Sequence, residues 1–412
     1  MRILLISHTC QSSTEGQPKA HVLGMTPEID LHVLVPDRWL HYGKWRAPEA
    51  PPDASFKMIT GKIQRPWSGP AQWYFHTYQN LKDILDELRP DVVDLWEEPW
   101  NYLSDQVCRL RDRYYPEMRI VSETEQNIDK HLPFPFEQYR SRTLRSADYL
   151  IGRSIEAVKV VRDKGYTGPA AIVPNAVDDS LFRPQDRDAC RRELGLSGFV
   201  VGYVGRVVPE KGLVDVIDML AFAPEQVNVL IVGDGPIREE LELHATTVGV
   251  SSRVKFLSGR SLDELPRIMG AMDTLVLPSR TTQRWKEQFG RVLIEAQSCG
   301  IPVIGSDSGA IPDVVGGAGL VVPEGEPLAL AHAVRDLLYD QPLLDEMGSV
   351  GRQQVAERYT WYKVARNMVT IYEDVLRRPV SSQSPGRPQL PPIGREPREI
   401  SPSPDFSSFA KG

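Results

Sequence analysis

Residues 287–300 read EQFGRVLIEAQSCG and lie between two short apolar runs, Thr274–Leu277 and Ile301–Ile304. Apolar runs of this length are typical of strands buried in a parallel sheet. The apolar residues within the quoted stretch supply the buried face of a helix that begins near Gly290. The segment therefore predicts a strand, a helix and a second strand, an alternation that is typical of an α/β domain.

Two carboxylates of this stretch, Glu287 and Glu295, are eight residues apart. We expect Glu287 to precede the helix and Glu295 to lie about a turn and a half inside it. The first amides of a helix are unpaired and lie at the positive end of its dipole, so the turn Phe289–Val292 suits an anionic or hydroxyl-rich ligand. Glu295 would face the same ligand further along the helix.

Length and composition indicate two globular domains. The chain has 412 residues, more than a single ordinary core, and 41% of them are hydrophobic and 25% charged. The net charge of −7 argues against a general nucleic-acid binder. The four cysteines are far apart, lack the paired spacing of metal ligands, and are expected to be buried free thiols in a reducing cytoplasm: Cys10, Cys108, Cys190 and Cys299.

The first ten residues, MRILLISHTC, have an apolar core too short for a signal peptide, so they predict a first strand. No stretch approaches the roughly eighteen apolar residues of a spanning helix, so any membrane contact would be peripheral to a cytoplasmic protein. Between Gln138 and Lys164, on predicted helices, seven basic residues stand against three acidic ones. This bias fits a solvated face and leaves contact with an anionic lipid or membrane surface open.

The first half of the chain alternates strand-like and helical patterns, which predicts a doubly wound domain. The expected elements are strands at Arg2–Ser7, Leu31–Val35, Asp91–Leu95, Arg119–Ser122 and Ala170–Val173, with a helix at Leu81–Leu88.

The second half begins with a predicted strand, Phe199–Val204, followed by two cations, Arg206 and Lys211, at the turn into the next helix. The planar fork of Arg and the point charge of Lys suit the oxygens of a diphosphate. The elements expected after them are strands at Val229–Val232, Val254–Leu257, Thr274–Leu277, Pro302–Gly305 and Gly319–Pro323, and helices at Leu328–Leu338, at Leu344–Arg358 and up to Leu376.

Two loop features of the second half have different interpretations. Gly259-Arg260 and Ser279-Arg280 each follow a predicted strand. Ligands in open α/β sheets bind outside the carboxyl ends of strands, so both loops are candidates to border a nucleobase. Asp186 and Asp188 form an Asp-x-Asp pair at a helix start. We interpret that pair as a helix cap and not as a metal-diphosphate site.

The quoted stretch resembles the signature of the retaining GT-B glycosyltransferases of glycosyltransferase family 4, through its Glu-x7-Glu spacing, its Cys-Gly helix end and the Pro-Val-Ile-Gly that follows. The resemblance implies two Rossmann-like doubly wound domains that face a central cleft. It also implies these boundaries: an N-terminal acceptor-side domain over 1–182, a nucleotide-sugar-binding domain over 183–360, a helix over 361–378 that returns to the first domain, and a disordered Pro/Ser-rich tail over 379–412.

The same resemblance implies the reaction. A hexose would pass from a nucleoside diphosphate sugar to a glycan, lipid-linked or small-molecule acceptor, with retention of configuration and without a metal or other cofactor. Glu287 would stabilise positive charge on the sugar, Glu295 would hold the ribose, and Arg206 and Lys211 would grip the diphosphate. Gly16 in the first loop and the helix start complete the implied donor-binding set, whose helix members are Phe289, Gly290, Arg291 and Val292.

One position departs from the family pattern. Relatives place a His that contacts the donor sugar after the strand Arg119–Ser122, and this chain has Gln126 there, followed by Asn127. A carboxamide donates and accepts hydrogen bonds but takes up no proton near neutral pH. We therefore expect Gln126 to bind a sugar hydroxyl without acting as a base, with His131 as a second candidate for the missing His.

The proline-rich stretch from Trp39 to Tyr78 has no clear period and contains four tryptophans, namely Trp39, Trp45, Trp67 and Trp73. Exposed aromatic rings offer stacking faces for sugars, so we predict that this stretch forms the acceptor-side surface. The alternative is that the rings cover a sheet edge.

Two other functions remain open at this stage. A sugar-nucleotide epimerase would share the architecture and act on the donor alone. A non-catalytic sugar-nucleotide or glycan-binding protein would fit the loss of the usual His at Gln126. Release of free nucleotide only when an acceptor is present separates a transferase from the first, and binding without turnover would favour the second.

Overall fold

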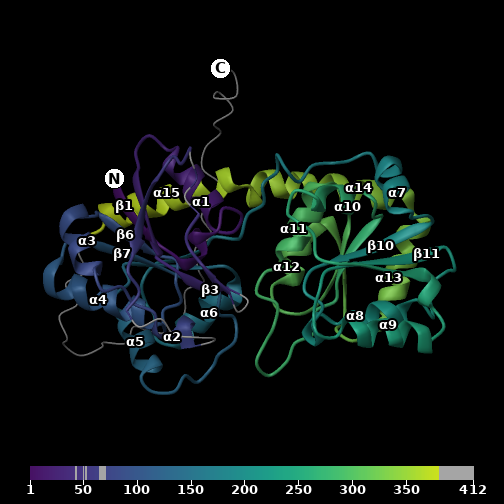
Figure 1. The fold of residues 1–412 in the computed structure, drawn as a ribbon, viewed down its shortest axis with the longest axis horizontal. Helices are drawn as coiled ribbons and strands as arrows, with labels where there is room; N and C mark the ends of the chain where they lie inside the picture. The colour runs from purple at the N-terminus through teal and green to yellow at the C-terminus, as the bar shows by residue number, and fades with distance from the viewer. Residues whose placement is uncertain (42–43, 50, 52, 65–70, 380–412) are drawn as a thin grey trace.

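The computed structural model describes residues 1–41, 44–49, 51, 53–64 and 71–379. It consists of two α/β domains that lie side by side, with the N-terminal domain on the left in Figure 1. Each domain is built on one parallel sheet, which confirms the predicted pair of Rossmann-like domains. Trp67 and the predicted tail beyond Pro379 lie outside the described residues.

The N-terminal sheet has seven parallel strands in the order β5-β2-β1-β6-β7-β8-β9. Alternate residues of β1 (Arg2–Ile6) face two separate cores, because successive side chains of a strand point to opposite faces: Ile3 and Leu5 pack in one core, Leu4 and Ile6 in the other. The remaining strands are β2 (Asp30–Pro36), β5 (Lys57–Gly61), β6 (Val92–Leu95), β7 (Arg119–Thr124), β8 (Tyr149–Gly152) and β9 (Ala170–Ile172).

Helices and short elements connect these strands. The helices are α1 (Gln17–Gly24), α2 (Ala71–Phe75), α3 (Leu81–Leu88), α4 (Tyr102–Tyr114), α5 (Phe136–Ser146) and α6 (Ile155–Asp163). The connecting loops also contain a short turn of 3-10 helix and a two-stranded antiparallel hairpin, namely η1 (His8–Gln11), β3 (Trp39–His41) and β4 (Lys44–Arg46).

Two strands of this domain correct the sequence-based expectation. β5 lies within Trp39–Tyr78, which its prolines make look irregular, and it pairs with β2 at the edge of the sheet. β8 interrupts Gln138–Lys164, which we expected to be helical. Its four residues are all buried between β7 and β9. A segment this short shows no hydrophobic periodicity, so its packing between two strands determines that it forms a strand.

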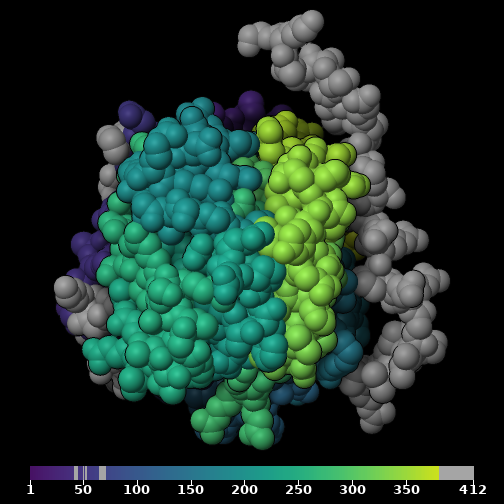
Figure 2. Space-filling model, turned by 90° about the vertical axis from the view of Figure 1, so that its right-hand side faces the viewer, coloured from purple at the N-terminus to yellow at the C-terminus, as the bar shows by residue number. Residues whose placement is uncertain are grey.

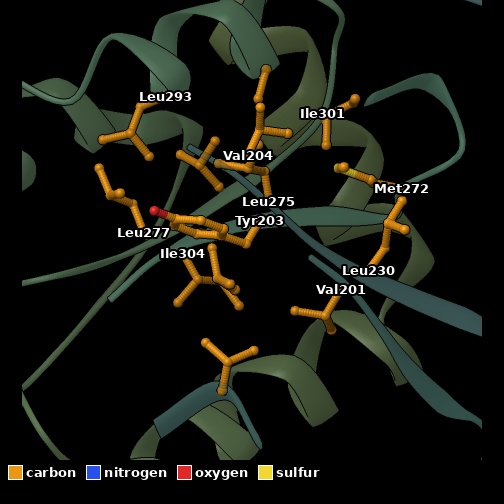
Figure 3. Packing of buried hydrophobic residues seen from close by; sticks show 14 of the residues in the cluster. Val201, Tyr203, Val204, Leu230, Met272, Leu275, Leu277, Leu293, Ile301 and Ile304 are labelled. Carbon is orange, nitrogen blue, oxygen red and sulfur yellow. The ribbon is translucent and has the colours of Figure 1, made fainter. Parts of the chain in front are cut away.

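The C-terminal sheet has six parallel strands in the order β12-β11-β10-β13-β14-β15. They are β10 (Phe199–Val204), β11 (Val227–Val232), β12 (Val254–Leu257), β13 (Thr274–Leu277), β14 (Val303–Ser306) and β15 (Gly319–Val322), close to the predicted bounds. Their side chains form one continuous core, and Figure 3 shows Tyr203 among aliphatic residues of neighbouring strands.

The connecting elements of the second domain are mostly helices. They are α7 (Arg187–Leu194), α8 (Leu213–Met219), α9 (Arg238–Thr247), α10 (Leu265–Gly270), α11 (Arg291–Ser298), α12 (Ile311–Val315), α13 (Pro327–Tyr339) and α14 (Gln341–Gln354). Shorter turns are η2 (Pro209–Lys211), η3 (Ser251–Arg253), η4 (Gly316–Ala318) and the π-helical η5 (Val355–Tyr359). Figure 2 shows the C-terminal helices, in yellow-green, as a column against the rest of this domain.

The predicted strand-helix-strand unit around Glu287 is present as β13, α11 and β14. α11 begins after Gly290, whose φ of 82° lies in the left-handed region. A Cβ at this position would lie 2.7 Å from Leu277 Cδ2. Glycine therefore permits the turn and also makes room for β13.

α15 (Trp361–Arg377) returns from the C-terminal domain to the N-terminal domain (Figure 1). Thr360 caps it by accepting a 3.2 Å hydrogen bond from Lys363 N. The buried face of α15 joins the core on the α1 side of the N-terminal sheet through Val364, Ala365, Met368, Val369, Ile371, Tyr372 and Val375. Val177 and Phe182, by contrast, already pack in the C-terminal core, although they precede the predicted boundary after residue 182.

Three smaller predictions can be compared with the structure. All four cysteines are free and buried, as expected. Asp186 accepts a 3.0 Å hydrogen bond from Ala189 N at the start of α7, which confirms the interpretation as a helix cap. None of the helices in the described part of the chain is long and apolar enough to cross a membrane.

Candidate active site

Glu287 lies in a polar cluster formed by loops of the C-terminal domain. Lys211 Nζ, at the end of η2, lies 2.5 Å from Glu287 Oε2, and Ser279 Oγ donates a 2.8 Å hydrogen bond to the same oxygen. These loops follow the carboxyl ends of β10 and β13, the edge at which open α/β sheets bind ligands. Because only 8% of Glu287 is exposed, its charge is compensated mainly by Lys211.

The backbone of Glu287 is held from both domains. Its carbonyl oxygen accepts a hydrogen bond from Ala310 N at 3.2 Å within the C-terminal domain. The same oxygen accepts a 2.8 Å hydrogen bond from Asn127 Nδ2, which comes from the loop after β7 of the N-terminal domain. The carbonyl and the carboxylate therefore have separate partners, and together these fix the orientation of the residue.

The neighbours of Glu287 also contact the N-terminal domain. Gln288 Nε2 donates a 3.0 Å hydrogen bond to Glu125 O, and Lys286 forms an ion pair with Glu156 at the start of α6. We call Lys286–Gln288 and its partners Glu125, Asn127 and Glu156 the interdomain seam. Through it, the loop that precedes α11 meets the carboxyl edge of the N-terminal sheet.

The two residues predicted to bind the diphosphate, Arg206 and Lys211, differ in whether their side chains are already paired. The guanidinium of Arg206 is exposed and makes no hydrogen bond or ion pair with any residue in the described ranges, while the Arg206 carbonyl accepts a 2.7 Å hydrogen bond from Tyr203 Oη. Lys211 is bound to Glu287, and its Nζ lies 5.0 Å from the ring centroid of Trp285. An anion would therefore find Arg206 free but would share Lys211 with Glu287.

Glu295 lies on α11, as predicted, and is largely buried. Burial raises the pKa of its carboxyl group, and Arg291, at 3.9 Å from Oε1, opposes that shift. Phe289 packs edge-to-face against Tyr359, with 5.8 Å between the ring centroids, and Val292 packs against the C-terminal core. No side chain in the described residues caps α11, so the helix start offers a ligand its backbone amides.

The other predicted donor-binding positions lie on the two domains separately. Gly16 is buried, and a Cβ there would lie 2.5 Å from Cys10 N, so close packing within the N-terminal domain accounts for this glycine. Gly259 N donates a 2.8 Å hydrogen bond to Asp234 Oδ2, and both Gly259 and Arg260 are exposed after β12. Their contacts with a donor stay predictions.

Gln126 lies beside the interdomain seam. Its Nε2 donates a 3.0 Å hydrogen bond to Ile128 O, so this amide is held by its own loop, and Oε1 has no partner among the described residues. His131 is exposed. The next residue, Asn127, makes the contact with Glu287, which the sequence did not indicate.

Ser279 lies in a loop that we expected to border the nucleobase, whereas sequence reasoning did not select Asn127. Asn127 also follows a strand at the carboxyl edge of its sheet, and that position is the signal that could have identified it. The hydrogen bonds of both residues to Glu287 depend on the approach of separate loops, which no local pattern records.

Several known proteins resemble this chain over much of its length. The sequence profile described as "Glycosyl transferases group 1" matches residues 186–354, which include Lys211, Ser279 and Glu287. A D-inositol 3-phosphate glycosyltransferase from Streptomyces bingchenggensis is 35% identical over 354 residues, which cover 79% of this chain and 72% of the relative. A protein of the same name from Corynebacterium jeikeium is 31% identical over 309 residues, which cover 68% of each chain.

Two solved structures share the two-domain architecture. The sucrose-phosphate synthase of Thermosynechococcus elongatus has a TM-score of 0.71 and 22% identity, and the match covers 91% of this chain and 99% of that one. Anabaena HepE in complex with UDP has a TM-score of 0.69 and 20% identity, and the match covers 91% of this chain and 100% of that one. At these identities the likeness concerns the fold.

Proposed function

The chain belongs to the group 1 glycosyl transferases, and from this premise we propose that it moves a hexose from a nucleoside diphosphate sugar to an acceptor hydroxyl with retention of configuration. The supporting observation is the contact of Lys211 with Glu287 just before the start of α11, together with the free guanidinium of Arg206 in the same loop after β10 as Lys211. Two cations and unpaired helix amides suit a diphosphate. A carboxylate beside them suits a sugar that gains positive charge.

One bond breaks and one forms at the anomeric carbon. The bond to the diphosphate oxygen breaks, and that oxygen keeps the electron pair while Arg206 and Lys211 stabilise its charge. The acceptor oxygen bonds to the same face of the carbon, and its proton passes to the departing phosphate oxygen, so no protein base is needed at Gln126. Loss of one such electrostatic donor typically costs roughly 2.7–4 kcal/mol.

The other residues proposed to contact the donor are assigned from their places in the C-terminal domain. We propose that Glu287 stabilises the positive charge on the sugar, that Glu295 binds the ribose, and that Gly259 and Arg260 border the base. Because Arg206 and Lys211 supply the positive charge that a diphosphate requires, we propose that the reaction is independent of metal ions. Transfer that persists in excess EDTA is the expected result.

The relatives suggest which donors to test first. HepE has been solved with UDP and with UDP-glucose, and a relative from Corynebacterium glutamicum is named as a GDP-mannose-dependent mannosyltransferase. A thermal-shift panel of UDP-, GDP- and ADP-sugars should identify the base, since a ligand at 100 times its Kd adds about 2.7 kcal/mol to apparent stability.

A transfer assay then separates the candidate functions. Free nucleotide should appear with a carbohydrate acceptor and stay at background without one. Conversion of the donor sugar in the absence of an acceptor would instead indicate an epimerase. Saturable donor binding with no turnover across a broad acceptor panel would indicate a non-catalytic binding protein.

We propose a cytoplasmic location, in keeping with four buried free thiols. The basic stretch between Gln138 and Lys164 gives little support for membrane contact, because many of its charges are paired. The pairs are Arg140 with Glu137, Arg142 with Asp105, Lys159 with Asp163, and Lys164 with Asp129. We therefore favour a carbohydrate or small-molecule acceptor over a lipid-linked one.

A further inference from the structure

His8 begins η1, shortly after the end of β1, and is held by a buried carboxylate, Glu97, from the loop after the neighbouring strand β6. Glu97 Oε1 accepts a 2.7 Å hydrogen bond from His8 N and lies 2.7 Å from His8 Nδ1. The other carboxylate oxygen of Glu97 accepts a 3.3 Å hydrogen bond from Asn101 Nδ2 and lies 3.7 Å from His76 Nε2. Four groups thus hold Glu97, and Glu97 fixes the imidazole of His8.

This arrangement determines which ring nitrogen of His8 is available. Burial would raise the pKa of Glu97, but the imidazoles of His8 and His76 hold that pKa well below its usual range. An ionised carboxylate only accepts hydrogen bonds, so the ring nitrogen that faces it, His8 Nδ1, carries a hydrogen, and the tautomer with its single hydrogen there leaves Nε2 bare. Nε2 is then an acceptor, and it makes no hydrogen bond within the described part of the chain. It is therefore available to a hydroxyl group.

Two tryptophans pack against this imidazole. Trp39 is buried and stacks on His8, with 4.5 Å between ring centroids and 25° between ring planes. Trp73 meets His8 edge-on at 4.6 Å and Trp39 edge-on at 5.5 Å. Trp73 nevertheless remains 45% exposed. An indole that is held on one side and open on the other offers a stacking face to the apolar side of a sugar or cyclitol ring.

Continuous contacts connect this cluster to the interdomain seam. Glu98, the neighbour of Glu97, accepts a 2.8 Å hydrogen bond from Glu125 N. Glu125 O in turn accepts the hydrogen bond from Gln288, which adjoins Glu287. Figure 1 also shows β3, which begins at Trp39, on the side of the N-terminal domain that faces the C-terminal domain.

The charge of the cluster discriminates between kinds of ring. Glu97 is held ionised, and it forms no ion pair with a lysine or arginine among the described residues. A phosphate or carboxylate on a bound ring would meet like charge here. The site therefore favours an uncharged ring.

We propose that His8 and Trp73 bind the acceptor, an uncharged pyranose or cyclitol ring whose apolar face stacks on Trp73 and whose attacking hydroxyl donates a hydrogen bond to His8 Nε2. Glu97 is a positioning residue that acts through His8. The inference rests on the proposed transferase function and adds the chemical class of the acceptor.

The test measures binding of three rings to the full-length protein saturated with UDP, by ligand-observed NMR. The probes are methyl α-D-glucopyranoside, myo-inositol and D-inositol 3-phosphate. His8→Phe keeps an aromatic ring on Trp39 but removes Nε2, and Trp73→Ala removes the stacking face. The matched control is Trp45→Ala, because Trp45 is 46% exposed and pairs with Leu40, which points to the opposite face of the β3-β4 hairpin from Trp39.

At least one neutral ring should bind the wild type, and myo-inositol should bind more tightly than its phosphate. His8→Phe and Trp73→Ala should each weaken binding of the neutral ring about tenfold, whereas Trp45→Ala should not. Glu97→Gln should weaken binding in the wild-type background and add nothing to His8→Phe. A merely structural role for Glu97 would make its effect independent of His8.

Measuring the UDP affinity of the same samples distinguishes a failure of the acceptor proposal from a failure of the proposed transferase function. A wild type without UDP affinity would contradict the proposed donor site, and the rings would then be titrated without nucleotide. Urea unfolding curves like that of the wild type show that the variants are folded, and His8→Gln replaces His8→Phe if the latter is not. Binding of neither neutral ring to the wild type, unaltered binding in the His8 and Trp73 variants, or tighter binding of the phosphorylated ring would overturn the proposal.

Discussion

Asn127 and Glu287, 160 positions apart in the chain, meet across the interdomain seam, where Asn127 Nδ2 donates a 2.8 Å hydrogen bond to Glu287 O. Replacing Asn127 with Ala should lower kcat/KM by about tenfold, the worth of one ordinary hydrogen bond. The Kd for UDP should change little, because the proposed diphosphate ligands lie in the C-terminal domain. Steady-state kinetics and a UDP titration measure both, and equal losses would show that Asn127 supports nucleotide binding instead.

Lys211 and Glu287 should depend on one another for stability. Lys211→Ala leaves the buried Glu287 carboxylate with Ser279 as its remaining described side-chain partner and should lower the free energy of unfolding by about 1–3 kcal/mol. Arg206→Ala should leave that free energy unchanged, although both variants should bind UDP more weakly. Urea unfolding is the measurement. Stability should recover in the double variant Lys211→Ala/Glu287→Gln, and its failure to recover would contradict the proposed dependence.

The two glutamates around α11 should have different kinetic effects. Glu287→Gln should lower kcat while the Kd for UDP is nearly kept, because Glu287 is proposed to stabilise charge that develops on the sugar. Glu295→Ala should mainly weaken UDP binding. Initial rates over a donor series, together with direct UDP titration, distinguish the two effects. The opposite pattern would refute this division of roles.

Gln126 should contribute one neutral hydrogen bond to the donor sugar. Its Nε2 is held by Ile128 O, which leaves Oε1 to accept from a hydroxyl. Gln126→Ala should therefore lower kcat/KM by about tenfold and leave the shape of its pH profile unaltered. If Gln126→Ala keeps full activity while His131→Ala abolishes it and removes an ionisation near pH 6–7, the role belongs to His131.

Glu98 should make the protein less stable as the pH rises. Burial raises the pKa of its carboxyl group from 4.5 to about 7, so the folded state binds this proton more tightly than the unfolded chain does. Its contribution favours folding below pH 4.5 and declines as the pH rises through about 7. Urea unfolding at pH 5 and pH 8 should show a loss of about 1–3 kcal/mol that Glu98→Gln reduces. An equal pH dependence in wild type and variant would contradict the assignment.

The sequence was most informative where local pattern and fold agree. The strands of the second domain are apolar runs buried on both faces, so their apolar residues alone identify them in the sequence. The observed bounds of β10 to β15 are therefore close to the predicted ones. Lys211 and Glu287 were both selected from their positions beside strand ends and helix starts. Their direct contact was not predicted, because it joins residues 76 positions apart through the approach of two loops.

The first domain was harder to predict for identifiable reasons. β8 has four residues between basic helices, and β5 lies among prolines, so in both cases packing against neighbouring strands outweighs the local signal. Within the Trp39–Tyr78 stretch Trp39 is buried while Trp45 and Trp73 are exposed, and the acceptor-side role of the exposed rings stays a prediction. The partners of His8 come from three separate segments and leave no trace in the sequence near it.

The return of α15 also has a consequence for the order in which the protein matures on the ribosome. The first 182 residues leave the exit tunnel early, yet the core on the α1 side of their sheet stays incomplete until Val364–Val375 has been synthesised. The C-terminal domain, whose sheet is contiguous in sequence, can complete its core before that point. We therefore expect the N-terminal half to finish folding last, in contrast to the usual N-to-C order of nascent chains. Chains that end at residue 360 and have been released from the ribosome should remain protease-sensitive before residue 177 and resistant beyond it, whereas equal resistance in both halves would disprove this order.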